Sequence, residues 1–214
     1  MSTLFRKSIF VFLACILPIF AGEGVDFMND IIFRFEKMRG SLIDDFSKKN
    51  RKKISDDARE LALSILDVEE IGRLALGKYY TKVSEAQRKE FTGLFHDLMA
   101  NRVANSQIPK RKIKSDKIPI RVVREAAKKD RVFKKDAVVV YTNVPHKRVI
   151  YDVDFYLFKS KDGLKLYDIH IDESSTLLDF RNQFSRIIKK RGMKYLLKKL
   201  RSKLKQLKVK PRKK

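Results

Sequence analysis

Between residues 118 and 172, apolar side chains recur at every second position, and on both sides of this segment they recur at every third or fourth position. A period of two is typical of strands with one buried face, and a spacing of three and four is typical of amphipathic helices. Helices, then a run of strands, then helices again predict a single α+β domain.

Four strands are expected in this segment, and their connections are short enough for antiparallel pairing. Residues 161–163 (KDG) read as a hairpin turn, because Asp-Gly accepts positive φ, and residues 143–146 (NVPH) read as a second turn. The apolar faces of the four strands are Ile118, Ile120 and Val122; Ala137, Val139 and Tyr141; Val149, Tyr151, Val153, Phe155 and Leu157; and Tyr167, Ile169 and Ile171.

Helix signals flank the strands. Asp67 can cap a helix that Gly77 ends, and Ser84 with Gln87 forms a capping box. A basic link, KKNRKK, separates the first two helices, and Gly192 ends the helix that follows the strands. We expect helices over residues 28–46, 55–66, 67–77, 84–99, 177–192 and 193–207.

The first 22 residues have the layout of a secretory signal peptide: Arg6 and Lys7, an apolar stretch, then small residues near a cleavage site at Ala21–Gly22. An uncleaved anchor and a lipoprotein cut before Cys15 are the alternatives. Cleavage would remove Cys15, the one cysteine, and so any thiol chemistry. We therefore expect an exported domain over residues 23–207 and a basic tail over residues 208–214.

The chain has 50 Lys and Arg against 26 Asp and Glu, a formal net charge of +24. Such a charge bears on partners, and nucleic acid and anionic membrane surfaces are the two candidate polyanions. Export favours the membrane surface and argues against nucleic acid.

No motif for catalysis is evident. Phosphate-binding glycine patterns are absent, and the three histidines have no metal-ligand spacing. Ser174 and Ser175 are better explained as caps of the following helix than as nucleophiles. Asp168 and Asp172 share a strand face that reads as exposed to solvent. We expect no enzyme, no metal and no cofactor. The fifteen Phe and seven Tyr fit either a solid core or an apolar cavity, and periodicity cannot separate these two.

Two segments carry a resemblance to a known family. Residues 67–99 (DVEEIGRLALGKYYTKVSEAQRKEFTGLFHDLM) and 167–200 (YDIHIDESSTLLDFRNQFSRIIKKRGMKYLLKKL) resemble the MlaC, or toluene-tolerance, family of periplasmic phospholipid-shuttling proteins. Three positions differ from residues that are common in the family: Glu173 stands in place of Gly, Leu164 in place of Trp and Val103 in place of Tyr. In the first segment the matching positions are Arg73, Leu76, Gly77, Tyr79, Tyr80, Gln87, Arg88, Phe91 and Phe95.

The resemblance implies a curved four-stranded sheet covered by helices that enclose an apolar lipid pocket. It implies a monomeric periplasmic carrier, without catalytic activity, that moves phospholipid between an outer-membrane lipoprotein complex and an inner-membrane ABC transporter. The alternative is an exported basic binding protein that docks on anionic membrane or polymer surfaces, and a hydrolase using Ser175 is the weakest hypothesis. The expected lipid-binding residues are Leu74, Tyr79, Phe91, Phe95, Val139, Tyr141, Val153, Phe155, Tyr167, Ile169, Phe180, Phe184 and Ile188.

Arg181 poses a separate question, because it borders the apolar stripe formed by Leu177, Phe184 and Ile188 on one helix face. It can bind the phosphate of a lipid, or it can hold the helix in place by pairing with Asp168, with Asp172 or with carbonyls at a helix end. We favour the structural role.

Overall fold

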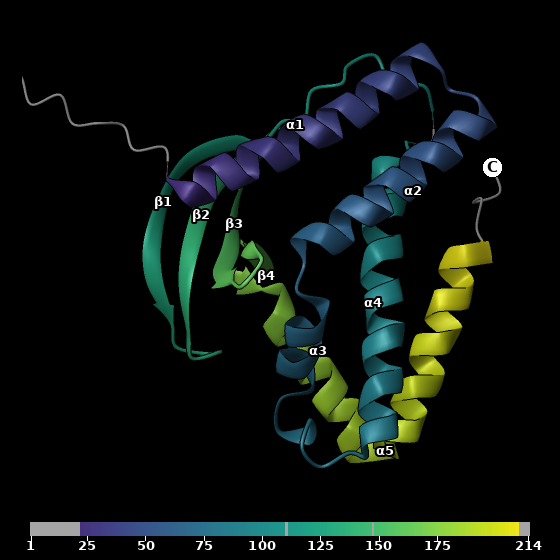
Figure 1. Ribbon diagram of the computed structural model, residues 1–214, viewed down its shortest axis with the longest axis vertical. Helices are drawn as coiled ribbons and strands as arrows, with labels where there is room; N and C mark the ends of the chain where they lie inside the picture. Colours follow the sequence, from purple (N-terminus) through teal and green to yellow (C-terminus); the bar gives the residue numbers. More distant parts are fainter. Residues whose placement is uncertain (1–21, 110, 147, 210–214) are drawn as a thin grey trace, which may run out of the picture.

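A computed structural model describes residues 22–109, 111–146 and 148–209. It is an α+β fold in which a curved antiparallel sheet stands beside a group of helices (Figure 1). Of the predicted signal peptide only Gly22 is described, and residues 210–214 of the predicted tail are not. The elements are α1 (Glu23–Asp44), α2 (Lys48–Ile65), α3 (Val68–Leu76), η1 (Gly77–Tyr79), α4 (Glu85–Gln107), β1 (Arg121–Asp130), β2 (Lys135–His146), β3 (Val149–Ser160), β4 (Gly163–Ile171), β5 (Ser174–Ser175) and α5 (Thr176–Val209).

The sheet has five strands in the order β1-β2-β3-β4-β5, so the prediction of four strands is wrong by one short strand. β5 contains only two residues and pairs with the end of β4. Leu66 makes a single bridge to Leu166 further along the same edge of β4. The outer edge of β4 is therefore covered at two places, while β1 forms the other edge of the sheet.

Two strand boundaries differ from the prediction. β1 begins at Arg121, after Ile118 and Ile120, because the backbone N–H of Ile118 donates to Glu36 of α1 and not to a strand. The predicted turn at residues 143–146 belongs to β2. Pairing with β1 ends at Asn143, so Pro145, which lacks an N–H, lies where that side of β2 has no partner to bond.

The helix ends follow the predicted caps. Ser84 and Gln87 form the capping box, and Asp67 accepts the backbone N–H of Glu70 at 2.9 Å. Gly77, with φ of 52°, ends α3, and Gly192, with φ of 77°, interrupts α5. KKNRKK is not a link but the first turns of α2, because the Ser47 hydroxyl caps that helix by accepting the N–H of Asn50.

Helix α1 lies across one face of the sheet (Figure 1). A Cβ atom on Gly24 would come within 2.8 Å of Val138 Cγ1, so the backbone of α1 approaches the sheet where only glycine fits. Glu125 of β1 accepts the N–H of Val25 at 2.8 Å and fixes the start of α1. Within the described part of the chain, none of the helices combines the length and the hydropathy that a membrane span requires.

The register of β2 against β3 corrects the prediction of the sheet faces. Val140 pairs with Phe155 and Val139 pairs with Tyr156, so Val139 lies on the opposite face from Phe155. Tyr141 shares that opposite face, where the Arg124 guanidinium lies 3.8 Å from its ring centroid. The face on which α1 packs carries Val140 and Phe155 and is called the α1 face.

Candidate functional site

An apolar strip runs along the α1 face of β3 and β4. It consists of Val149, Tyr151, Val153 and Phe155 on β3 and of Ile169 and Ile171 on β4. Val149 is 51% exposed and Ile171 is 47% exposed, whereas Phe155 and Ile169 are half-buried. The next residue of the strip on β3, Leu157, has no exposed surface. The strip therefore leads from solvent into the core.

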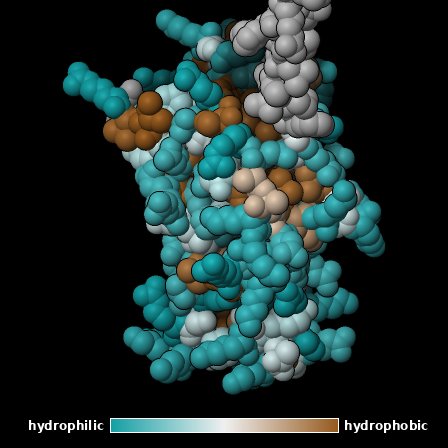
Figure 2. All heavy atoms as spheres, turned by 90° about the vertical axis from the view of Figure 1, so that its left-hand side faces the viewer, coloured by the Kyte–Doolittle hydropathy of each residue, from teal (hydrophilic) through white to brown (hydrophobic). Residues whose placement is uncertain are grey.

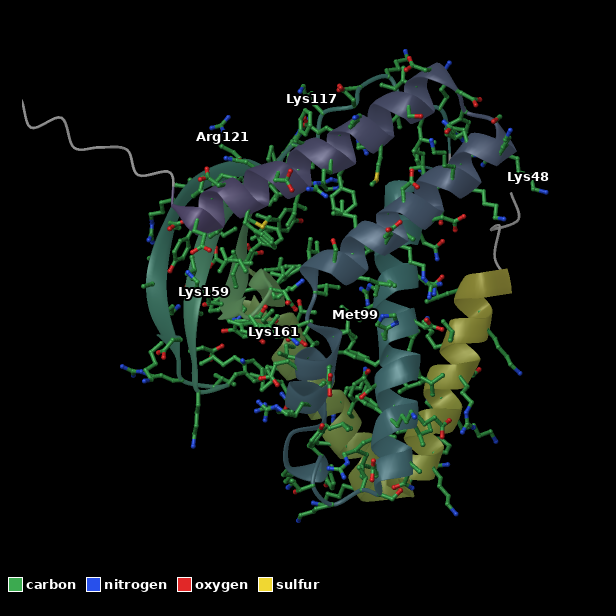
Figure 3. All side chains as sticks on the ribbon, viewed as in Figure 1. Lys48, Met99, Lys117, Arg121, Lys159 and Lys161 are labelled. Carbon is green, nitrogen blue, oxygen red and sulfur yellow. The ribbon has the colours of Figure 1, made fainter. Side chains whose placement is uncertain are left out.

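A small apolar pocket lies at the inner end of this strip, where β4 meets α3, α4 and α5. Its volume is about 40 Å³, and Met99 points into it from α4 on the side of the sheet (Figure 3). Ligand pockets for drug-sized molecules measure roughly 300–1,000 Å³. The predicted preformed lipid cavity is therefore not seen at this place. The pocket is lined by Leu66, Ile71, Met99, Leu166, Tyr167, Asp168, Ile169, Thr176, Leu177 and Phe180.

A larger hollow of about 550 Å³ lies between α1 and α2. Met38, Ile54 and Leu61 form its apolar part, and charged side chains such as Lys53 and Glu60 line the remainder. None of the predicted lipid-binding residues lines it. Apolar ligands require apolar walls, so we take the strip and the small pocket as the candidate site in spite of the difference in volume.

The predicted aromatic residues of α4 and α5 form a packed cluster. Phe91, Phe95, Phe180 and Phe184 stack or meet edge to face, with ring centroids 5.5–5.8 Å apart. Phe91 has no exposed surface, whereas Phe180 is half-buried and reaches the pocket. This cluster joins α4 to α5, and Phe180 connects it with the candidate site.

The remaining predicted residues lie at separate places. Leu74 is buried in α3, and Tyr79 is half-buried in η1. Ile188 packs against the core from α5. Tyr167 lines the pocket, whereas Val139 is on the sheet face opposite the strip. The structure thus brings Val153, Phe155, Tyr167, Ile169 and Phe180 to the strip or the pocket, and contact of all these residues with lipid stays a prediction.

Asp168 is buried at the pocket, although the sequence predicted a solvent-facing carboxylate. One of its oxygens accepts the backbone N–H of Leu177 at 2.8 Å, and the other accepts the Ser175 hydroxyl at 2.5 Å. Burial raises the pKa of Asp168, and these two donors partly oppose the rise. Asp168 lies on the same strand face as His170, as alternation predicted, and it is buried because Ser175 of β5 and the start of α5 cover that part of the face.

Ser175 caps α5, as predicted, by accepting the N–H of Leu178 at 2.9 Å. The histidine nearby, His170, lies 3.1 Å from Asp168 and stacks on Tyr156. In a serine hydrolase the histidine stands between serine and aspartate, but here Asp168 stands between the other two. This order suits a clamp at a helix start. Among the described residues no group of three potential metal ligands occurs.

Arg181 holds α5 against α3, which is the structural role that we favoured. Its Nε donates to the carbonyl of Leu74 at 2.7 Å, and its guanidinium lies 4.4 Å from the ring centroid of Phe133. Gly77 makes room for it, since a Cβ there would lie 3.2 Å from Arg181 Nε. Partial burial lowers the pKa of Arg181, and the charge of Arg73 lowers it further. The partner is thus a helix-end carbonyl and not a carboxylate of Asp168 or Asp172.

Arg181→Ala is expected to lower the free energy of unfolding by about 1.5–3 kcal/mol, because a charged hydrogen bond to a carbonyl is lost. Urea unfolding measures this loss. Arg186→Ala removes an exposed arginine from the same helix and should change stability by no more than about 0.5 kcal/mol. Equal losses in the two variants would contradict the assigned role of Arg181.

Comparison with known proteins agrees with this architecture. A phospholipid-binding protein from Ralstonia solanacearum, solved in complex with a phospholipid, superposes with a TM-score of 0.64 at 19% sequence identity. The match covers 87% of this chain and 97% of that protein. A search of curated proteins gives no match. The family model described as MlaC protein matches residues 40–202, and the chain therefore belongs to the MlaC family.

Proposed function

We propose that this protein is a non-enzymatic phospholipid carrier. The acyl chains of the bound lipid lie along the apolar strip of β3 and β4 and reach the pocket beneath it. The observation that carries the proposal is the gradient of exposure along the strip, from Val149 at 51% to Leu157 at 0%. A continuous apolar path between solvent and core is what an acyl chain needs. Membership of the MlaC family and the fold shared with a phospholipid-binding protein support this assignment.

The energetics require a larger cavity than the pocket of about 40 Å³. Each buried methylene contributes about 0.8 kcal/mol, so a two-chain lipid gains most of its stabilisation only when both chains leave water. The carrier must therefore separate its helices from the sheet when it loads. Phe155 and Ile169 are half-buried and lie at the boundary between the sheet and the helices. A separation of the helices from the sheet would expose more apolar surface there.

In this proposal the mature chain works in the periplasm as a monomer, after removal of residues 1–22. It receives or delivers phospholipid at an inner-membrane ABC transporter and an outer-membrane lipoprotein complex, as the family resemblance implies. The positive charge of the chain suits contact with anionic membrane surfaces at either end of this route.

Mass spectrometry of an organic extract tests the proposal most directly. Protein purified without detergent is expected to yield phospholipid at a ratio near one lipid per chain, because a buried double-chain lipid does not dissociate freely in water. A sample of the same protein, unfolded and refolded without lipid, is the control. Lipid-free protein that also fails to take up phospholipid from vesicles would refute the carrier function and leave the basic binding protein as the explanation.

A further inference from the structure

Exposed aliphatic side chains gather at one end of the sheet. Ile150 is 67% exposed, Val123 56%, Val149 51% and Ile171 47%. Val149 and Ile150 begin β3 at the β2–β3 hairpin, Ile171 ends β4 opposite Val153, and Val123 sits in the irregular start of β1. We call these four residues the sheet tip. Figure 2 shows apolar patches toward the upper part of the side that carries β1, and Arg121 marks this end of the sheet in Figure 3.

Charged residues surround the sheet tip unevenly. Arg121, Arg124 and Arg148 are exposed on β1 and at the hairpin. The acidic residues stand on the β3–β4 side, where Asp152 accepts a hydrogen bond from Asn143 at 2.7 Å and Asp172 accepts the N–H of Asp152 at 3.2 Å. Glu173 is also exposed there. The hairpin and β1 thus present cations beside Val149 and Ile150.

From this arrangement we infer that the sheet tip inserts into the headgroup region of an anionic lipid bilayer, hairpin first. The inference rests on the proposed carrier function, because the apolar strip starts at the sheet tip. Val149 and Ile171 are both the outer end of the strip and part of the tip. An acyl chain that passes from the bilayer at this point enters the strip without crossing water.

Two features favour a bilayer over a protein partner. The sheet tip consists of valines and isoleucines, whereas energetically dominant residues of protein interfaces are enriched in Trp, Tyr and Arg set into pockets. Exposed aliphatic groups beside arginines also match the two layers of a membrane surface, in which anionic headgroups lie above hydrocarbon. Because the sheet tip consists of only four side chains, we expect it to insert to a shallow depth.

The chain contains no tryptophan, so a single introduced tryptophan reports on its own position. Ile150→Trp places the probe at the sheet tip, and Val132→Trp places it between β1 and β2, at the other end of the sheet, where Val132 is 51% exposed. With vesicles of phosphatidylglycerol and phosphatidylcholine, we expect a blue shift and quenching by brominated acyl chains for Trp at position 150 only. If the tryptophan at position 150 keeps the emission wavelength of a solvent-exposed indole while the protein sediments with vesicles, the inference is overturned.

A second pair of variants removes the dependence on one probe. Val149→Asp combined with Ile150→Asp should reduce co-sedimentation with the same vesicles by about tenfold or more, because two apolar groups no longer leave water. Val132→Asp should leave it unchanged. Circular dichroism confirms that each variant folds. An equal reduction in both variants would also overturn the inference.

The same samples separate this inference from the carrier function. A wild-type protein that contains phospholipid but shows no insertion at position 150 retains the carrier function and loses the docking surface. A protein that inserts at position 150 but never contains phospholipid retains the docking surface and loses the carrier function. Extraction and fluorescence are therefore measured on the same preparation.

Discussion

Phe155→Glu is expected to give a folded protein from which no phospholipid can be extracted. Phe155 lies in the middle of the strip and is half-buried, so a carboxylate there can reach solvent when the site is empty. When acyl chains occupy the strip, the same carboxylate is enclosed by hydrocarbon, and the cost of burying an unpaired charge expels the lipid. Lipid per protein, measured by mass spectrometry beside a thermal unfolding curve, checks the result.

Two alanine variants provide the matched comparison. Phe91→Ala empties a fully buried position between α4 and α5 and should cost about 3–5 kcal/mol whether or not lipid is present. Phe155→Ala should cost less, and its cost should change when the protein is delipidated, because a flexible acyl chain can fill the space. If both variants lose the same stability in both conditions, Phe155 belongs to a solid core and does not contact lipid.

The second large effect is expected from Asp168→Ala, which should lower the free energy of unfolding by about 3–5 kcal/mol, because three donors lose their acceptor at once. The change removes the acceptor for the N–H of Leu177, the hydroxyl of Ser175 and the N–H of Ile169, and buried donors without acceptors are costly. The start of α5 would then lose its attachment to β4. Chemical denaturation monitored by circular dichroism measures the loss.

Asp168→Asn is the control, because the amide oxygen can still accept the N–H of Leu177 while the charge is removed. The pKa of Asp168 is raised in the folded protein, so the folded state binds the proton more tightly than the unfolded chain. This carboxyl therefore makes the protein less stable as pH rises from its unfolded value of about 3.9 through the raised folded value. The Asn variant should lose that part of the pH dependence. A loss of stability as large as that of the Ala variant would contradict this account.

Much of the architecture could be predicted from local signals. Period-two alternation located β3 and β4, and the apolar face of β3 predicted from it is the strip that the structure shows. Capping residues placed the ends of α3 and α4. The two segments that carry the family resemblance also meet in space, because Arg181 of one packs against Gly77 of the other. No local pattern predicts such a contact, since it depends on how α3 and α5 pack together.

What could not be predicted depends on relations between segments. Val139 and Phe155 both sit on apolar strand faces, but only the register of β2 against β3 reveals that these faces are opposite. Asp168 is buried because β5 and the start of α5 fold back over the end of β4, a contact that the alternation within β4 does not contain. The size of the pocket depends on the distance between helices and sheet, which hydrophobic periodicity does not encode.

The coverage of the sheet edges has a consequence for self-association. Leu66 and β5 occupy the outer edge of β4, so β1 is the edge that remains for pairing within the described structure. Two copies that met along β1 in an antiparallel arrangement would place the exposed Arg124 and Lys128 of one copy, which share one sheet face, close to the same residues of the other. Like charges opposite each other on neighbouring strands repel. These cations therefore disfavour edge-to-edge pairing through β1, which could otherwise extend the sheet into a fibre.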